Sequence, residues 1–388
     1  MLTIQPITVL FTGYAPVHFL CFRPLYEQLV RLAGVKVYVS GGLRTQAATG
    51  YHYDGAGMYA PFPIPPEQIL SVDEIQNRRF DVLFSANKRI ILPPENVGVK
   101  IQIFHGVSFR NRGVRVENLV YDFFFLIGPY MQRKFVETGL LTADDPRGVP
   151  IGFPKTDPLL MRDFDRKAML SKYGFDGKRP ILLYAPTGQA DNSLEIMGKE
   201  IIQRLATTDQ YDLLIKPHDH PKDKDTDWFV ELEPYENDHT RVVRALDIVP
   251  LLRLSDLLIT DASSMANEYA LLNRPLVFLD VPELIQRAKD QGAFVDETLG
   301  RRGGLLVERP DQIEEIIATS LANSEEFSEI RQGIAQDLFY NPGGATEAAI
   351  EWFTRQFLGK GEAGGAGEME KLSVDSKLLF TATPTHPH

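Results

Sequence analysis

The chain alternates short apolar runs with amphipathic segments, and it completes this rhythm twice. In the first half, the runs suited to buried strands are residues 7–12, 35–40, 80–85, 100–104 and 123–127. In the second half, they are residues 181–185, 211–215, 257–260 and 276–279. Segments with the spacing of helices separate the runs. Strands that alternate with helices pair in parallel, so the pattern predicts an α/β protein with two doubly wound parallel sheets.

The length of the chain predicts more than one domain. Because 388 residues exceed what one hydrophobic core usually organises, we expect an N-terminal domain at residues 1–150 and a C-terminal domain at residues 151–342. Residues 343–357 have the pattern of a closing helix. Residues 358–388 are rich in glycine and then polar, which is typical of a disordered tail. Residues 50–66, rich in Tyr, Gly and Pro, predict an ordered loop or lid.

The charge and cysteine content exclude some partners and locations. With 52 acidic and 41 basic residues, the net charge of −11 argues against a broad nucleic-acid surface. Cys21 is the single cysteine, so no internal disulfide can form, and a reducing cytoplasm is expected. No secretory signal and no run of about 18 apolar residues is evident, so any membrane contact is expected to be peripheral, at the inner face.

The first candidate site follows a predicted strand of the N-terminal domain. His105, Gly106 and Ser108 come directly after the run at residues 100–104. Ligands of open α/β sheets bind at the carboxyl ends of strands. An imidazole can take a proton from a hydroxyl near neutral pH, and the glycine lets the backbone approach a substrate. The alternative is a structural histidine in a turn.

The second candidate site follows a strand of the C-terminal domain. Lys216 and His218 flank Pro217, which ends the strand because it has no backbone donor. A cation beside an imidazole suits the oxygens of a phosphate. The alternative is a solvated charged loop, which the neighbouring charged residues at positions 220–225 also suit.

The third candidate site joins a strand to a helix. Asp261, Ser263 and Ser264 follow the run at residues 257–260, and a helix is predicted directly after them. Backbone N–H groups, the helix dipole and two hydroxyls can together receive a pyrophosphate. Glu268 lies one helical turn later and could accept hydrogen bonds from a ribose or an alcohol. The alternative is an ordinary N-cap, for which Asp and Ser are favoured without a ligand.

Two other segments lie at predicted strand ends. Gly13 and His18 belong to the first strand-to-helix turn, which lacks the GxGxxG spacing of a dinucleotide site and is expected to line the acceptor side. Thr187 and Gly188 follow the first strand of the second half, where Thr187 could touch a donor or simply form a turn. Neither a Walker loop nor a recognised metal-ligand spacing is present, so the residues support no cofactor.

The order of these motifs resembles that of the CDP-glycerol glycerophosphotransferase family of teichoic-acid enzymes. The resemblance lies in His105-Gly106, residues 151–157 (IGFPKTD), residues 183–187 (LYAPT), Lys216-Pro217-His218 and residues 259–264 (ITDASS). It implies a GT-B architecture, in which two Rossmann-like domains face a cleft and the C-terminal one holds most of the donor. The phosphate-binding segment of the family matches Asp261 to Ser264, with Ala262 in place of a Tyr. The acidic residue of the next helical turn matches Glu268.

The resemblance also implies a reaction. The two functional histidines of the family match His105 and His218. By this analogy His105 is the general base on an acceptor hydroxyl, which attacks the β-phosphate of a CDP-activated alcohol and releases CMP. His218 and Lys216 would neutralise phosphate charge, and the resemblance implies that no metal is needed. The acceptor would be a glycan, a lipid-linked molecule or a polyol phosphate.

Other functions are compatible with the same pattern. A nucleotide-sugar glycosyltransferase or a UDP-sugar 2-epimerase would use the same fold, because a fold does not determine its chemistry. A binding protein that retains the site without turnover is a third interpretation. The released product separates these functions: CMP indicates phosphoalcohol transfer, whereas UDP indicates sugar chemistry.

Overall fold

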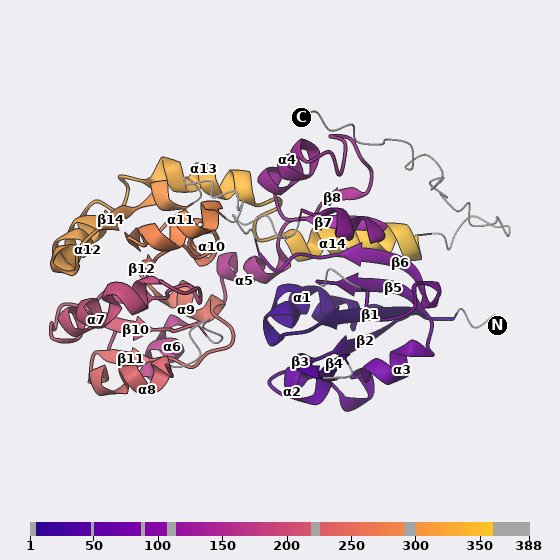
Figure 1. Cartoon of the computed structure of the whole chain (residues 1–388), viewed down its shortest axis with the longest axis horizontal. Coiled ribbons are helices and arrows are strands. Elements are labelled where there is room, and N and C mark those ends of the chain that lie inside the picture. The colour runs from indigo at the N-terminus through magenta and orange to yellow at the C-terminus, as the bar shows by residue number, and fades with distance from the viewer. Residues whose placement is uncertain are drawn as a thin grey trace, which may run out of the picture. The chain divides into compact units, whose positions relative to one another are not determined.

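Two six-stranded sheets dominate the protein (Figure 1). The computed structural model describes residues 5–47, 50–86, 90–106, 114–218, 226–290 and 300–359. Within these residues, all strand pairs of the two large sheets are parallel. The predicted α/β class with two doubly wound sheets is therefore confirmed.

The first sheet has the strand order β2-β1-β5-β6-β7-β8. Its strands are β1 (Ile7–Gly13), β2 (Val35–Gly41), β5 (Phe80–Ser85), β6 (Val97–Gln102), β7 (Phe123–Leu126) and β8 (Gly148–Pro150). The helices among them are α1 (Pro16–Leu29), α2 (Gly55–Tyr59), α3 (Val72–Gln76) and α4 (Pro129–Glu137). The order reverses between β1 and β5, and an open α/β sheet binds its ligand beside such a point.

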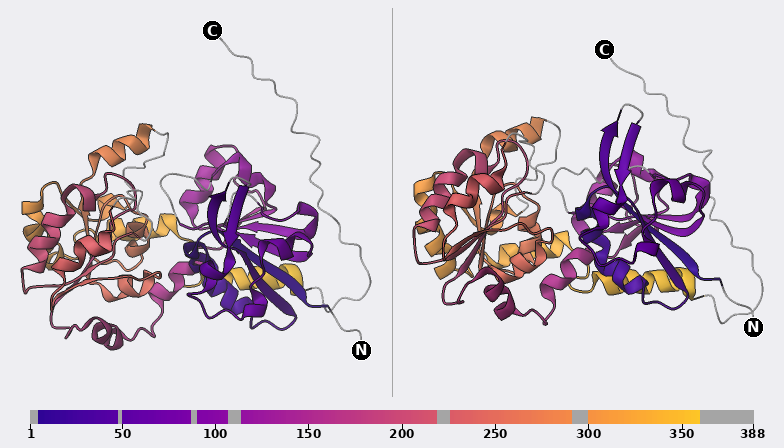
Figure 2. Two further views of the ribbon diagram at one scale, coloured as in Figure 1. Left: turned by 60° about the horizontal axis from the view of Figure 1, so that its bottom comes forward. Right: turned by 90° about the horizontal axis from the view of Figure 1, so that it is seen from below.

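A two-stranded antiparallel hairpin follows β2. It consists of β3 (Leu43–Ala47) and β4 (Gly50–Asp54), and it extends away from the first sheet (Figure 2). The side chain of Asp54 then accepts a hydrogen bond from the Gly57 amide and caps α2. An ordered loop or lid without regular elements was expected over residues 50–66. This expectation is wrong for the part of the segment that forms β4 and α2.

The second sheet has the strand order β11-β10-β9-β12-β13-β14. Its strands are β9 (Ile181–Tyr184), β10 (Asp212–Ile215), β11 (Thr240–Val242), β12 (Leu257–Thr260), β13 (Leu276–Leu279) and β14 (Leu305–Val307). Its helices are α5 (Asp157–Leu160), α6 (Arg166–Tyr173), α7 (Lys199–Ala206), α8 (Trp228–Leu232), α9 (Val249–Leu254), α10 (Met265–Ala270), α11 (Pro282–Asp290) and α12 (Ile313–Ala322). This sheet has the order of a dinucleotide-binding fold, and its order reverses between β9 and β12.

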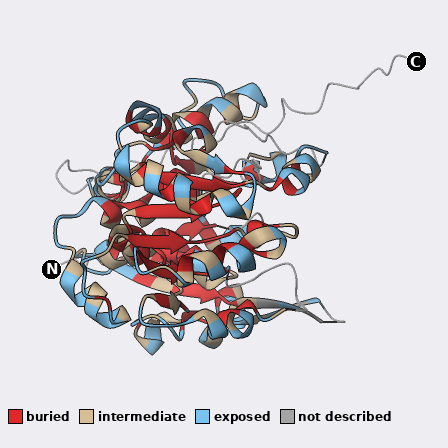
Figure 3. Cartoon of the chain, turned by 90° about the vertical axis from the view of Figure 1, so that its left-hand side faces the viewer, coloured by how far each residue is buried: buried red, intermediate tan, exposed pale blue. Residues whose placement is uncertain are grey.

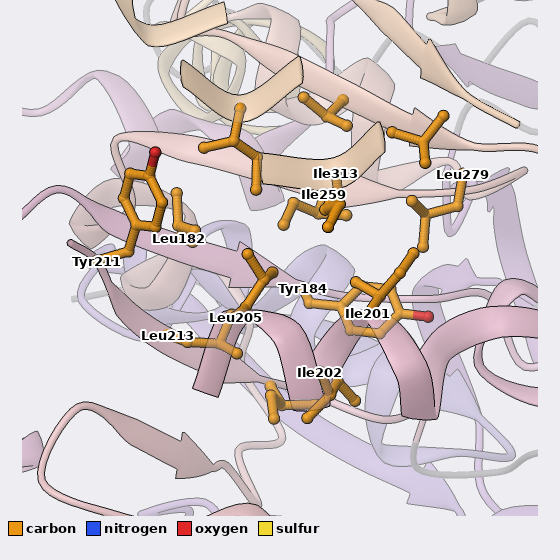
Figure 4. Close-up of a cluster of buried hydrophobic side chains, with 14 of the residues drawn as sticks. Leu182, Tyr184, Ile201, Ile202, Leu205, Tyr211, Leu213, Ile259, Leu279 and Ile313 are labelled. Carbon is orange, nitrogen blue, oxygen red and sulfur yellow. The ribbon is translucent and has the colours of Figure 1, made fainter. Parts of the chain in front are cut away.

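The second sheet is buried on both faces. Leu182 and Tyr184 of β9 point to one face, where they pack with Ile201 of α7 (Figure 4). Ile181 and Leu183 alternate with them and pack on the other face. Each fully buried side chain of this size contributes roughly 1.5–3 kcal/mol. The strands of both sheets are accordingly buried, whereas helices expose their outer faces (Figure 3).

The chain returns to the first sheet after α12. On α13 (Ser328–Leu338), Asp337 receives two hydrogen bonds, of 2.6 and 2.7 Å, from Arg133 of α4. Asp157 caps the start of α14 (Ala345–Phe353), because its carboxylate accepts from the Ala345 and Thr346 amides at 3.1 and 2.7 Å. Burial raises the pKa of Asp157, and these bonds oppose that shift.

The domain limits expected at residues 150 and 342 stay a prediction. The two sheets fall on either side of residue 150, since β8 ends at Pro150 and β9 begins at Ile181. Residues 360–388 of the expected tail lie outside the described residues. Among the described helices, none combines the length and hydropathy that crossing a membrane requires.

Candidate functional site

The first motif lies three residues beyond the end of β6. His105 is exposed, and Gly106 has a φ of 149°, which favours glycine. The His105 ring lies against the His18 ring, with 4.9 Å between the ring centroids. Ser108, the remaining residue predicted for this motif, lies outside the described residues. The structure thus brings His105, which was predicted to be catalytic, against His18, which was predicted to line the acceptor side.

The turn between β1 and α1 places His18. Pro16 occupies the first turn of α1, and His18 follows with 3% of its surface exposed. A Cβ at Gly13 would lie only 2.9 Å from the Cβ of His18, so the close approach requires glycine. Residues Gly13 and His18 therefore form one packed unit at the carboxyl end of β1.

Asp261 lies at the point where the strand order of the second sheet reverses. Its Oδ1 accepts the Thr187 amide at 2.9 Å, and its Oδ2 accepts the amide and hydroxyl of Ser193 at 3.0 and 2.9 Å. The side chain is 1% exposed. Burial raises the pKa of Asp261, although the hydrogen bonds from Ser193 and Thr187 oppose that shift. Asp261 thereby ties the loop after β9 to the loop after β12.

The two serines precede α10. Ser264 is the N-cap residue of α10, and its side chain makes no capping hydrogen bond. The Ser263 hydroxyl accepts the Met265 amide at 3.3 Å. A Cβ at Gly106 would lie 3.9 Å from the Ser264 hydroxyl oxygen. A residue that follows β6 of the first sheet therefore borders a residue that follows β12 of the second.

The second candidate site of the sequence lies beyond β10. His218 is exposed, and its ring lies so close to Gly188 that a Cβ there would be 2.5 Å from the ring. Gly188 follows Thr187, whose amide binds Asp261. Lys216 is 5% exposed, and its Nζ donates to the Pro217 carbonyl at 3.1 Å. The exposed imidazole and the buried ammonium thus belong to one loop.

Glu268 forms a buried ion pair that the sequence did not reveal. Lys155 donates to both oxygens of the Glu268 carboxylate, at 2.9 and 2.8 Å. Burial is the largest single influence and lowers the pKa of Lys155, but the charge of Glu268, its hydrogen bond and other nearby acidic groups together raise it above the ordinary value. The functional role predicted for Glu268 stays a prediction, and the structure adds Lys155 as the partner of its carboxylate.

Residues from both sheets therefore form a continuous series of neighbours. It begins at His218 and Gly188, continues through Asp261 to Ser264, and ends at Gly106 beside His105. Exposed imidazoles, hydroxyls and the amides at a helix start are the groups that bind phosphate and move a proton. Among the described residues, no cluster of three or more His, Cys, Asp or Glu side chains could hold a metal ion.

Two parallel sheets in succession, with polar loops at the carboxyl ends of their strands, define the class of the protein as a GT-B type α/β protein. The family model described as CDP-Glycerol:Poly(glycerophosphate) glycerophosphotransferase matches residues 93–348. This match covers most of the chain, and the chain belongs to that family.

Similar proteins include enzymes of teichoic acid synthesis. The chain is 32% identical to teichoic acid glycerol-phosphate primase of Bacillus spizizenii over 130 residues, which are 33% of this chain and 32% of the primase. It is 26% identical to the teichoic acid poly(ribitol-phosphate) polymerase of the same species, over 52% of this chain and 33% of the polymerase. These matches thus span about a third of the length of either relative.

Solved structures share the fold over nearly the whole chain. The wall teichoic acid polymerase TagF is similar with a TM-score of 0.67 and 17% identity, over 93% of this chain and 91% of that one. A UDP-N-acetylglucosamine 2-epimerase is similar with a TM-score of 0.58 and 13% identity, over 94% and 99% of the two chains. Such low identities inform on the fold alone, and they confirm the expected GT-B architecture.

Proposed function

We propose that the chain transfers a glycerol-phosphate-like group from a CDP-activated donor to a hydroxyl of a polyol-phosphate acceptor, and releases CMP. Membership of the family supports this reaction class. The observation that carries the proposal is the approach of Gly106 to Ser264. It brings a candidate general base from one sheet beside a candidate phosphate site from the other. A cytoplasmic location, in which any membrane contact is peripheral and at the inner face, is part of the same proposal.

In the proposed step, the acceptor oxygen forms a bond to the phosphorus that carries the glycerol. The bond from that phosphorus to CMP breaks, and CMP leaves with the bonding electrons. His105 takes the proton of the attacking hydroxyl. Such a transfer depends mainly on positioning and on charge stabilisation, so imidazoles and a helix start can suffice.

The donor side of the proposed site is the second sheet. Ser263 and Ser264, which precede α10, receive the diphosphate oxygens through their hydroxyls. His218 and Lys216 offset their charge. Asp261 supports the site through the loops that it binds, including the Thr187 amide, because both of its oxygens are occupied by protein donors.

The remaining predicted residues support or border this site. Glu268 and Lys155 hold α10 in place through their ion pair. Gly13 and His18 lie beside His105 and line the acceptor side.

The test of the proposal is His105→Ala. CMP release from CDP-glycerol is expected to fall by about a hundredfold or more, the usual contribution of a general base. Binding of CDP-glycerol, measured by calorimetry, is expected to change little. His52→Ala removes an exposed histidine of β4 and serves as the control. Unchanged CMP release by His105→Ala would remove His105 from the role of base.

A donor panel tests the reaction class. A ligand that binds only the folded chain raises its unfolding temperature, so CDP-glycerol, CDP-ribitol and UDP-sugars can be compared by thermal shift. CDP-linked donors are expected to stabilise the chain and to yield CMP with a polyol-phosphate acceptor. Stabilisation by UDP-sugars alone, with release of UDP, would refute phosphoalcohol transfer.

A further inference from the structure

His18 is a buried imidazole in an unusual position. It lies in the first turn of α1 and is 3% exposed. The Tyr14 ring packs against its ring, with 4.2 Å between centroids and 82° between the ring planes. The His105 ring packs against it as well, at 4.9 Å and 35°. The His18 ring is thus in contact with the candidate general base.

A hydrogen bond fixes the orientation of the His18 ring. The Tyr14 amide donates to Nδ1 of His18 at 3.3 Å. A ring nitrogen that accepts an N–H bond carries no proton, so the proton of the neutral ring is on Nε2. The bond therefore holds the His18 ring in a single orientation.

We propose that His18 is a positioning residue for His105: its ring, held by the Tyr14 amide, supports one side of the His105 ring and fixes its direction. This inference rests on the proposed function, in which His105 is the base. His105 itself is exposed, and its backbone continues into Gly106, whose φ of 149° gives little restraint on the ring. A base that turns by a small angle loses its alignment with the hydroxyl, and such displacements can reduce turnover about a hundredfold.

The first measurement is independent of turnover. With the chain labelled at the histidine Cε1 positions, NMR relaxation reports the order of the His105 ring, whose signal is assigned by its absence in His105→Ala. In the unaltered chain the order parameter is expected near 0.85, and in His18→Ala below about 0.6. Leu20→Ala removes another buried side chain of α1 and should leave His105 ordered. An equally ordered His105 ring in His18→Ala would overturn the inference.

The second measurement separates positioning from a purely structural role. His18→Asn retains an acceptor for the Tyr14 amide but has no ring to contact His105. The inference predicts that this variant also loses His105 order and that its kcat falls by tenfold or more, with the KM for CDP-glycerol within about twofold. If His18→Asn keeps both kcat and His105 order, the ring has no positioning role. The test therefore stands even where His18→Ala fails to fold.

The two proposals fail in distinguishable ways. Loss of His105 order in both His18 variants, in a chain that releases no CMP from any CDP-linked donor, would refute the proposed reaction and leave the contact role of His18 intact. CMP release by the unaltered chain, together with unchanged His105 order in the variants, would refute the role of His18 alone.

Discussion

The two sheets hold the loops at their carboxyl edges by different means. At the edge of the second sheet, the buried charge of Asp261 binds two loops, and Lys155 pairs with Glu268 beneath α10. At the edge of the first sheet, Thr12 and Ser40 lie side by side in the register of β1 and β2. Their hydroxyls are buried and have no hydrogen-bond partner among the described residues.

This difference extends to the two motif histidines. The His218 ring lies against the bare backbone of Gly188, whereas the His105 ring lies against the His18 ring. Buried charges need matched partners, and removing one partner leaves the other uncompensated. Uncharged groups constrain a loop mainly through their shape. We therefore expect the edge of the second sheet to be far more sensitive to substitution than that of the first.

The largest effect is expected for Lys155→Met. The substitution leaves the Glu268 carboxylate buried without its cation, which typically destabilises a fold by about 3–5 kcal/mol. Urea unfolding measures this loss. The matched control is Lys199→Met, since Lys199 and Glu231 form a half-exposed pair that is shorter still, at 2.6 Å, and its loss should be much smaller. Adding Glu268→Leu to Lys155→Met should restore much of the stability, and equal losses in Lys155→Met and Lys199→Met would contradict the comparison.

The next largest effect is expected for Asp261→Ala. This change removes the acceptor of three hydrogen bonds from Thr187 and Ser193, at a cost of about 2–3 kcal/mol. Asp261→Asn keeps one acceptor oxygen, so it should lose less stability. Binding of CDP-glycerol should weaken in both variants, because the loops of the donor side are no longer tied. A fully stable Asp261→Ala chain with normal donor binding would show that this carboxylate does not organise the site.

A smaller effect on stability is expected for Gly188→Ala. The added methyl would lie 2.5 Å from the His218 ring, so the ring must move. Such overpacking costs about 1–2 kcal/mol. Turnover should fall by more than the loss of stability alone would cause, because the displaced His218 ring no longer lies at the donor side of the proposed site. Gly333→Ala adds a methyl to α13 with no atom within 4 Å and serves as the control. A Gly188→Ala chain with unchanged turnover would argue against a role for His218.

Sequence patterns predicted the strands of four or more residues in both large sheets, and those of the second sheet are buried throughout. β9, β12 and β13 are continuous apolar runs, which only the interior of a parallel sheet accommodates. The three-residue strands β8, β11 and β14 escaped prediction, because three residues are too few to show a period and depend on pairing with a neighbour. The hairpin of β3 and β4 was missed since its glycines and tyrosines resemble a loop.

The candidate site was predictable where a motif ends a strand. Asp261 and Ser264 could be placed at the edge of a sheet, because parallel strands end together. The partners of the charged residues could not be found in this way. Lys155 and Glu268 are 113 positions apart in the sequence, and Asp261 and Ser193 are 68 positions apart. Ser193 lies in no motif, and the motif IGFPKTD at residues 151–157, which contains Lys155, does not reveal its partner.

The smallest effect on stability is expected when a buried threonine at the end of a strand is replaced by valine. Two such threonines can be compared, one in each sheet, because they differ mainly in whether the hydroxyl has a hydrogen-bond partner. Thr12 ends the apolar run of β1 in the first sheet, and Thr260 ends β12 in the second; each is 0% exposed. The Thr260 hydroxyl donates to the Ala185 carbonyl at 2.7 Å, whereas that of Thr12 has no partner among the described residues. Replacement by Val preserves the shape of either side chain.

Thr260→Val should therefore cost about 1 kcal/mol, since it also leaves the Ala185 carbonyl without this donor. Thr12→Val should be close to neutral or slightly stabilising, because burying an unbonded hydroxyl is unfavourable and the substitution removes that cost. Urea unfolding of the two variants gives the difference directly. If Thr12→Val proves as costly as Thr260→Val, then the Thr12 hydroxyl has a bound partner. A further polar bond, besides the one from the Tyr59 hydroxyl to the Ser40 carbonyl at 2.8 Å, would in that case hold the edge of the first sheet, and the contrast between the two sheets would weaken.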